Sequence, residues 1–388
     1  MNILMLDLMG SLIASDLQYS FIKLGHKCKF VQYVLKDKEW NEDFAVFLKK
    51  ELQEGSFDMV FSTNYYPVVS KVCYLNNIVY CSWVYDSPPE IQSFDTLSYS
   101  TNRIFFFCKY DYAQYKQQFG LDTVYYLPLG VNTDRLDEIK PSEKYVSDFA
   151  LVGGLYKSGI FLELKSIMTP QQQQYMDAMI QVQITRAGSG VVDAALTEEV
   201  VKEICDHYKE LSELAVQPNK AQLFYAICAH ITHLERVTLL RLLGDKGYHT
   251  RLYFGNINDQ DKELLSGHNV EILGNVNYGY EMPQVFKSCK VNLNPVLRAN
   301  RTAIPLRALD VMGGGGFLLS SHQAEFDDFF MADEVVTYEN LEEAIEKARY
   351  YLSHESERKL IARKGYERVK KDFSFIDRAN MILEKTIL

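Results

Sequence analysis

The sequence predicts an α/β protein made of two Rossmann-like, doubly wound domains that face each other across a cleft. Three observations predict this fold class. The chain has 388 residues, and a domain usually takes about 100–200. Apolar strand patterns alternate with helical patterns in two separate sets, and such alternation gives parallel sheets covered by helices on both faces. A polar stretch at 134–147 separates the sets and is predicted to link the domains.

The first set predicts an N-terminal domain over residues 1–145. The chain opens with an apolar strand at 2–6, and apolar residues then recur at helical spacing until Gly25 stops the helix. Further elements alternate in the same way: strands at 28–33, 59–62, 78–83, 104–108 and 124–127, with helices at 44–52, 68–75 and 110–119. These elements are enough for one doubly wound sheet.

The second set predicts a C-terminal domain over 146–372. It opens with a strand at 148–152 and is interrupted at about 158–243 by a stretch with helical character and almost no strand signal, which we interpret as a helical insertion. The alternation then resumes, with strands at 250–254, 270–273, 290–293, 316–320 and 334–337 and helices at 261–266, 282–289, 306–312 and 341–354. A cleft between two such domains is the default ligand site.

Composition excludes several classes of protein. The 41 basic and 51 acidic residues give a net charge of −10, which disfavours nucleic acid and anionic lipid as partners. No apolar run reaches about 18 residues, so no integral membrane segment is expected. The seven scattered cysteines form no CxxC or Cys/His cluster, and the N-terminus lacks the features of a signal peptide. We therefore expect a cytoplasmic protein with no zinc site.

The strongest candidate site combines a strand end at Asn294 with a helix predicted to begin at Ile304 and Pro305. Proline suits the first turn of a helix, whose free N–H groups attract phosphate. Arg307 could add donors for a diphosphate, and Asp310 could accept from two ribose hydroxyls. The alternative is an ordinary surface ion pair between Arg307 and Asp310 at i,i+3 spacing.

Two further loops follow predicted strands of the C-terminal domain. Gly153 and Gly154 could let a phosphate or sugar approach the backbone closely, although a plain tight turn also explains the pair. Asn275 and Val276 could present backbone groups to a base and Tyr278 could stack on it. The alternative for this second loop is a polar connection without a ligand.

Asp86 follows an apolar strand of the N-terminal domain, at the end where cleft residues belong. Its carboxylate could act as a general base towards an acceptor hydroxyl, or it could simply cap the turn before Pro88 and Pro89. The sequence Asp259-Gln260-Asp261 has the form of some metal-binding motifs, but its position favours a helix start. No metal site is predicted.

Motifs spread in order over nearly the whole chain resemble one known family, the bacterial GT-B glycosyltransferases of the spore-maturation (CgeB-like) type. The matching stretches are Trp83-x-x-Asp86-Ser87-Pro88, residues 126–132 and 147–156, Leu234-Glu235-Arg236, residues 291–294 and 304–310, and Glu357-Arg358-x-x-Ile361-Ala362-x-x-Gly365. The resemblance implies a GT-B fold and a metal-independent transfer without a cofactor, in which a nucleoside-diphosphate sugar, most simply a UDP-sugar, glycosylates a hydroxyl on a glycan or protein. It also implies that a helix in 373–388 crosses back to the first domain.

On this hypothesis the donor binds in the C-terminal domain, where Arg307, Arg236 and the helix start at Ile304 and Pro305 stabilise the departing diphosphate. Asp310 then holds the ribose. The remaining donor contacts come from the other predicted loops, namely Gly153, Gly154, Asn275, Val276, Tyr278 and Asn294. Asp86 activates or orients the acceptor in the N-terminal domain.

The chain departs from the pattern of many retaining GT-B enzymes, which carry two glutamates separated by seven residues. Asp310 stands at the second position, and Thr302 stands eight residues before it, so the first acid is missing. The family's donor-sugar contact is therefore not carried over to this chain. Two other functions share the fold: a nucleotide-sugar epimerase, and a sugar-nucleotide-binding protein that has lost catalysis.

Overall fold

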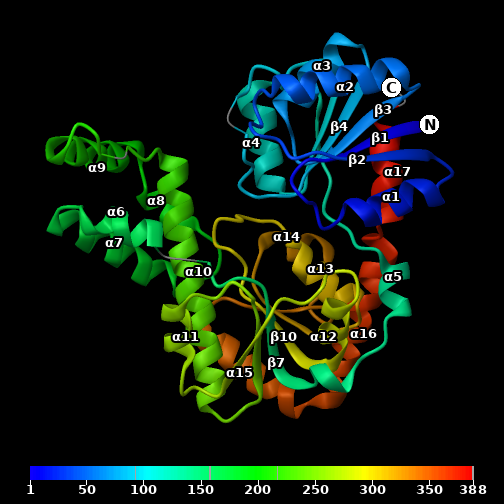
Figure 1. Cartoon of the computed structure of the whole chain (residues 1–388). Helices are drawn as coiled ribbons and strands as arrows, with labels where there is room; N and C mark the ends of the chain where they lie inside the picture. The colour runs from blue at the N-terminus through cyan, green and yellow to red at the C-terminus, as the bar shows by residue number, and fades with distance from the viewer. Residues whose placement is uncertain (92, 157–158, 216, 387–388) are drawn as a thin grey trace. The chain divides into compact units, whose positions relative to one another are not determined.

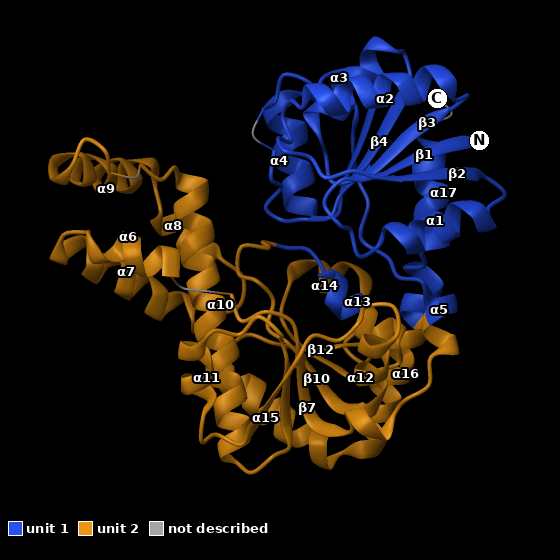
Figure 2. Ribbon diagram, viewed as in Figure 1, with its two compact units in different colours: residues 1–135, 302–309, 368–388 blue, residues 136–301, 310–367 orange. Residues whose placement is uncertain are grey.

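The computed structural model describes residues 1–91, 93–156, 159–215 and 217–386. They form two compact units (Figure 2). Unit 1 comprises Met1–Arg135, Thr302–Leu309 and Arg368–Leu388, and unit 2 comprises Leu136–Arg301 and Asp310–Glu367. The division after residue 135 precedes the predicted boundary at 145, because the end of the polar linker packs into unit 2: Tyr145 is buried there against Tyr253.

Unit 1 contains a six-stranded, wholly parallel sheet in the order β2-β1-β3-β4-β5-β6. This confirms the predicted doubly wound α/β fold of the N-terminal part. The strands are β1 (Asn2–Asp7), β2 (Lys27–Gln32), β3 (Met59–Thr63), β4 (Val79–Val84), β5 (Asn102–Phe106) and β6 (Val124–Tyr126). The helices that accompany them are α1 (Ala14–Lys23), α2 (Glu42–Glu54), α3 (Pro67–Leu75), α4 (Lys109–Phe119) and α5 (Thr133–Glu138), whose last three residues are assigned to unit 2.

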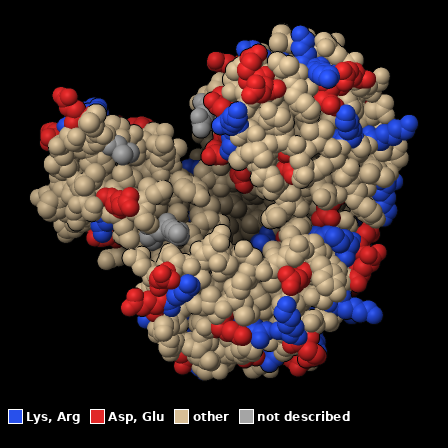
Figure 3. All heavy atoms as spheres, viewed as in Figure 1, with Lys and Arg blue, Asp and Glu red and all other residues tan. Residues whose placement is uncertain are grey.

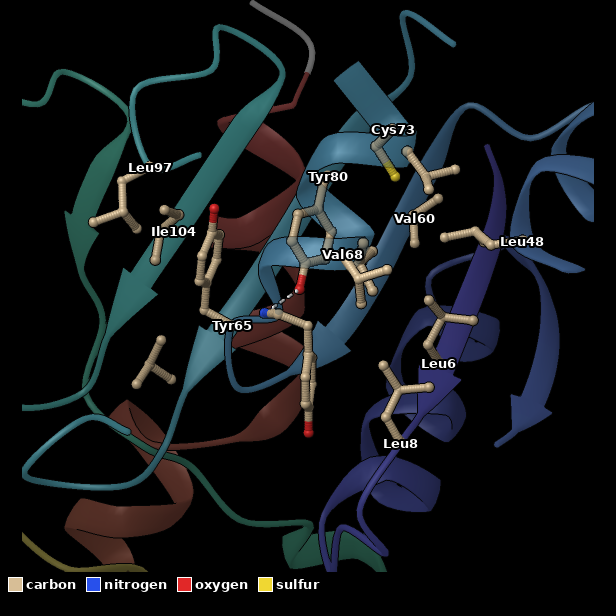
Figure 4. Packing of buried hydrophobic residues seen from close by; sticks show 14 of the residues in the cluster. Leu6, Leu8, Leu48, Val60, Tyr65, Val68, Cys73, Tyr80, Leu97 and Ile104 are labelled. Carbon is tan, nitrogen blue, oxygen red and sulfur yellow. Dashed lines mark hydrogen bonds between the residues drawn. The ribbon is translucent and has the colours of Figure 1, made fainter. Parts of the chain in front are cut away.

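Tyrosines are part of the core of unit 1. Tyr80 lies among aliphatic side chains in the packing that Figure 4 shows, and it is fully buried. Its hydroxyl accepts a hydrogen bond from the backbone N–H of Tyr66 (3.2 Å) and shares another with the hydroxyl of Ser62 (2.7 Å). A buried phenol needs such partners, so here the ring fills the core while the hydroxyl stays satisfied.

The C-terminal segment packs within unit 1. Its helix α17 (Phe375–Glu384) lies beside α1 (Figure 1), and the ring of Phe375 meets that of Trp83 edge-on at 6.0 Å between centroids. The N–H of Val131 donates to the carbonyl of Phe373, and the N–H of Phe375 donates to the carbonyl of Val131. The last two residues of the predicted helix, 387–388, lie outside the described residues.

Unit 2 contains the second six-stranded parallel sheet, in the order β12-β11-β10-β7-β8-β9. The chain order reverses between the neighbouring strands β7 and β10, which makes this pair the topological switch point of the sheet. The strands are β7 (Ser147–Val152), β8 (Thr250–Tyr253), β9 (Val270–Leu273), β10 (Cys289–Asn294), β11 (Leu318–Ser321) and β12 (Val336–Tyr338). The accompanying helices are α11 (Asp259–Leu265), α12 (Glu281–Ser288), α13 (Leu306–Gly313), α14 (Ala324–Phe329), α15 (Leu341–Ser353) and α16 (Glu355–Asp372); the start of α13 and the end of α16 are assigned to unit 1.

Five helices form the insertion in unit 2, which begins at the edge of the described residues because 157–158 are not described. They are α6 (Gly159–Ser166), α7 (Pro170–Gln183), α8 (Gly190–Ala195), α9 (Glu198–Leu211) and α10 (Lys220–Asp245). Thr169 and Thr197 cap α7 and α9, because their side-chain oxygens accept from the N–H groups of Gln172 and Val200 in the first turns. The first half of α10 packs in the core of the insertion and its second half packs on the sheet (Figure 1), so α10 joins the two.

On the face drawn in Figure 3, acidic and basic side chains are intermixed on both units. Within the described ranges, no helix is long and apolar enough to cross a membrane.

Candidate functional site

The switch point of unit 2 lies between the ends of β7 and β10. Gly153 and Gly154 follow β7, and Pro295 follows β10. Gly153 has φ +140°, a conformation that side-chain-bearing residues rarely adopt, and a Cβ on it would lie 3.7 Å from Nη1 of Arg236. In doubly wound sheets, ligands bind in the crevice at this point, so these two loops are where the structure puts the candidate site.

Arg236 on α10 connects the two loops. Its Nε and Nη2 donate to the carbonyl oxygen of Pro295 at 3.1 and 2.5 Å, and its Nη1 donates to the carbonyl oxygen of Gly154. The guanidinium also lies over the ring of Tyr156, with 4.7 Å between its central carbon and the ring centroid. Carbonyl oxygens carry no net charge, so these bonds fix the guanidinium without cancelling its positive charge.

The loop after β10 is also held by a buried ion pair. The Nε of Arg298 donates to Oε2 of Glu235 at 2.7 Å, and its Nη2 donates to Oε1 of the same glutamate. Both side chains are almost wholly buried. The Nη1 of Arg298 reaches the carbonyl oxygens of Arg186 and Gly188 in the insertion. A second guanidinium, that of Arg301, pairs with Asp193 at 2.8 Å. The insertion therefore braces the loop that follows β10.

Sequence reasoning missed the roles of Arg298 and Arg301. Both stand in the segment between the predicted strand end at Asn294 and the predicted helix start at Ile304. Their partners Glu235 and Asp193 are more than 60 positions away in the sequence, so no local spacing marks them. Only the rule that buried charges must be paired would have indicated that partners exist.

The helix predicted at Ile304 and Pro305 is α13, which begins at Leu306. Pro305 stands just before the first helical residue, and its carbonyl oxygen accepts from the N–H of Ala308 at 3.0 Å. Ile304 is buried, so its side chain serves packing. Arg307 lies in the first turn and half-buried, and residues 302–309 belong to unit 1 while Asp310 belongs to unit 2.

Asp310 and Tyr278 are brought together by the fold. Asp310 lies on α13 and is 3% exposed, and Tyr278 comes from the loop after β9. The tyrosine hydroxyl donates to Oδ1 of Asp310 at 3.1 Å. A carboxylate accepts several hydrogen bonds, so this pair suits recognition of vicinal hydroxyls such as those of a ribose.

The other residues predicted to contact the nucleotide-sugar donor hold the ends of the strands in place. Oδ1 of Asn275 accepts from the N–H of Gly255 at 2.8 Å and so joins the loops after β8 and β9. Val276 packs against the core beneath them. Asn294 is buried and donates through Nδ2 to the hydroxyl of Ser320 on β11 at 2.9 Å.

The Asp259-Gln260-Asp261 sequence is a helix start, as predicted. The side chain of Asn258 accepts from the N–H of Asp261 at 2.7 Å and caps α11, while Asp259 pairs with Lys262 at 3.1 Å. Among the residues that the structure describes, no group of three His, Cys, Asp or Glu side chains is placed to hold a metal ion.

Asp86 lies in the loop after β4 of unit 1. Its Oδ2 accepts from Nδ2 of Asn64 at 2.7 Å, and Oδ1 of Asn64 accepts from the N–H of Tyr85 at 3.1 Å. Although the residue is exposed, desolvation of its carboxyl raises the pKa of Asp86, and the hydrogen bond from Asn64 opposes that rise. A raised pKa suits a general base better than that of a fully solvated carboxylate.

The surroundings of Asp86 are polar and partly buried. Burial is the main cause that raises the pKa of the Tyr66 and Tyr85 hydroxyls, and the carboxylates of Asp86 and Asp7 raise both further. The next residue, Ser87, donates to Oδ2 of Asp111 at 2.6 Å and anchors the turn. The ends of β1, β3 and β4 thus bring two carboxylates and two phenols to one edge of the sheet.

Comparison with known proteins shows what this chain is similar to. Residues 231–384, less than half of the chain, match a family described as glycosyl transferase-like. No curated protein matches the sequence at a significant level.

Solved structures match over the whole length. A glycosyltransferase from Rickettsia africae has a TM-score of 0.61 at 10% identity, and covers 100% of this chain and 98% of its own. Sucrose-phosphate synthase from Thermosynechococcus elongatus has 0.59 at 9%, with coverages of 100% and 99%. HepE from Anabaena, solved in complex with UDP and glucose, has 0.56 at 10%, with 99% of each chain. At such low identity these matches show the fold, which is that of the GT-B glycosyltransferases.

Proposed function

We propose that the chain is a metal-independent glycosyltransferase of the CgeB-like type, which transfers a hexose from a UDP-sugar to a hydroxyl on a glycan or protein. The observation that carries the proposal is the switch point of unit 2, where the guanidinium of Arg236 is fixed between the carbonyls of Gly154 and Pro295. The matched glycosyl transferase-like segment and the complexes of the HepE neighbour with UDP support it. We also propose a cytoplasmic location, supported by the seven cysteines, all of which are described and none of which is in a disulfide.

The donor half of the mechanism is electrostatic. Backbone N–H groups at the start of α13, with Arg307 and Arg236, stabilise the negative charge that develops on the departing diphosphate. Asp310, oriented by Tyr278, accepts from the ribose hydroxyls. No step requires a metal ion, because these groups supply the positive charge.

The acceptor half depends on Asp86. Its carboxylate accepts a hydrogen bond from the acceptor hydroxyl, whose oxygen forms a bond to the anomeric carbon as the bond from that carbon to the diphosphate breaks. In an inverting reaction Asp86 takes the proton of the hydroxyl. In a retaining reaction it only orients the acceptor, and the proton leaves with the diphosphate.

A thermal-shift panel of nucleoside diphosphates and their sugars, repeated with a chelator, tests the donor class, since a ligand that binds only the folded state raises its apparent stability. We expect UDP to raise the melting temperature with or without chelator.

Arg307→Ala should lower turnover of the donor roughly 100-fold or more while the fold stays intact. The matched control is Arg349→Ala, which changes an exposed arginine on α15. No stabilisation by any nucleotide would contradict the proposal. An epimerised nucleotide sugar formed from UDP-GlcNAc without acceptor would instead indicate an epimerase.

A further inference from the structure

The loop after β1 in unit 1 is built so that a carboxylate already occupies its anion-binding position. In the sheet of unit 1 the chain order reverses at β1, which pairs with β2 on one side and β3 on the other. Phosphates in such folds bind the amides of the loop after this strand. Here the N–H groups of Gly10 and Ser11 both donate to Oδ1 of Asp7, at 2.9 Å each. A phosphate would have to displace that carboxylate.

The charges around this loop also oppose a phosphate. Asp16 stands in the first turn of α1, buried and paired with Arg135 at 2.8 Å. The loops after β1, β3 and β4, residues 8–13, 64–66 and 85–101, contain no Lys or Arg in their sequence. The loop after β4 carries three acids, Asp86, Glu90 and Asp95. Lys38 from the loop after β2 is paired with Glu90.

The same edge of the sheet exposes apolar side chains. Met9 and Leu12 in the loop after β1 are 57% and 53% exposed, and Val34 after β2 is 85% exposed. Asp7 on β1 and Gln32 on β2 are the last pair in the register of these neighbouring strands. Met9 and Val34 each stand two residues after their member of that pair.

The loops that carry these apolar residues leave the same edge of the parallel sheet as the loop after β4 that carries Asp86, and β3 alone separates β1 from β4. The hydroxyl of Tyr85 interacts electrostatically with both Asp7, which begins the apolar loop, and Asp86. A compound whose hydroxyl reaches Asp86 therefore meets, on a loop at the same edge of the sheet, the exposed apolar side chains of Met9 and Leu12.

We propose that the acceptor is an unphosphorylated hydroxyl compound whose apolar portion packs on Met9, Leu12 and Val34. This inference rests on the proposed function and narrows it to a class of acceptor. Burial of apolar surface supplies the affinity, and the carboxylates of Asp7 and Asp86 repel acceptors that carry phosphate.

Isothermal titration of the UDP-saturated protein with three probes tests this inference. The probes are octyl β-D-glucoside below its micelle concentration, methyl β-D-glucoside and glucose 6-phosphate. We expect the octyl compound to bind at least tenfold more tightly than the methyl compound, and glucose 6-phosphate to bind most weakly. The double variant Met9→Ser/Leu12→Ser should bring the octyl compound to within about threefold of the methyl compound. Leu75→Ser removes an exposed leucine at the end of α3, which is 70% exposed, and should leave the preference unchanged.

Tighter binding of glucose 6-phosphate, a lack of binding by the octyl compound, or an octyl preference that survives the double variant would each overturn the inference. These results are distinguishable from failure of the proposed function. A protein that binds UDP and transfers sugar to glucose 6-phosphate contradicts only the acceptor class, whereas a protein that binds no nucleotide contradicts the glycosyltransferase itself.

Discussion

The hydroxyl of Tyr278 donates a hydrogen bond to Oδ1 of Asp310 across 3.1 Å, although the two residues stand 32 positions apart in the chain. The fold brings them together because the loop after β9 and the helix α13 both lie at the carboxyl edge of one parallel sheet. Asp310 is buried, so its carboxylate depends on such donors, and Tyr278 supplies one.

Asp310→Asn should weaken UDP binding by roughly 10- to 100-fold, since hydrogen bonds to a charged group contribute about 1.5–3 kcal/mol. Tyr278→Phe should weaken it by about fivefold or less, because it removes only the group that orients the carboxylate. Isothermal titration with UDP measures both effects.

The ribose contact has its own control. With 2′-deoxy-UDP the loss caused by Asp310→Asn should shrink, because the nucleotide has one hydroxyl fewer to offer. Asp259→Asn, which changes a side chain that is 99% exposed, should leave UDP affinity unchanged. An equal loss with UDP and 2′-deoxy-UDP would assign Asp310 a purely structural role.

The fold could be predicted from the sequence because local pattern carries it. All six strands predicted in each half are present, since most of them are short apolar runs whose length and flanking turn residues favour a strand over a helix. The helix caps at Thr169 and Thr197 were predictable for a similar reason, because a cap is a contact over three residues.

The finer geometry of the site could not be predicted, because it depends on contacts between distant segments. Arg236 was expected to contact a diphosphate; the structure shows its guanidinium donating to carbonyl oxygens 59 and 82 positions away, which no local pattern indicates. Asn294 was expected to face the donor, and its side chain instead links β10 to β11 through Ser320. Sequence spacing identifies the strand end on which a residue stands, but not the neighbour to which its side chain turns.

Arg236→Ala should lower the free energy of unfolding by about 2–3 kcal/mol, because two carbonyls lose a charged donor. Arg236→Lys keeps the charge but cannot make three fixed bonds in two directions, so we expect it to recover only part of the loss. Urea denaturation measures these changes. Arg241→Ala, half-buried on the same helix, should cost clearly less.

The charge of Arg236 has a separate readout in nucleotide binding. If its guanidinium acts on the diphosphate, Arg236→Ala lowers the affinity for UDP much more than the affinity for uridine, while Arg236→Lys loses less. Equal losses for UDP and uridine would mean that Arg236 only holds the loops after β7 and β10 in place.

The pair of Asn64 and Asp86 predicts the direction of a pH effect. Desolvation raises the pKa of Asp86 above its ordinary value, and the hydrogen bond from Asn64 stabilises the ionised form and lowers it. A base must be ionised to act, so kcat/KM should fall on the acid side as Asp86 becomes protonated. Asn64→Ala removes the stabilising donor, the pKa of Asp86 rises, and the acid limb of the pH profile should move to higher pH. Asp86→Asn should abolish that limb together with most of the activity of an inverting enzyme. The control is Asn76→Ala, which removes an amide at the end of α3 in the same unit and should leave the pH profile unchanged. If the acid limb stays in place in Asn64→Ala, Asp86 is not the group that titrates.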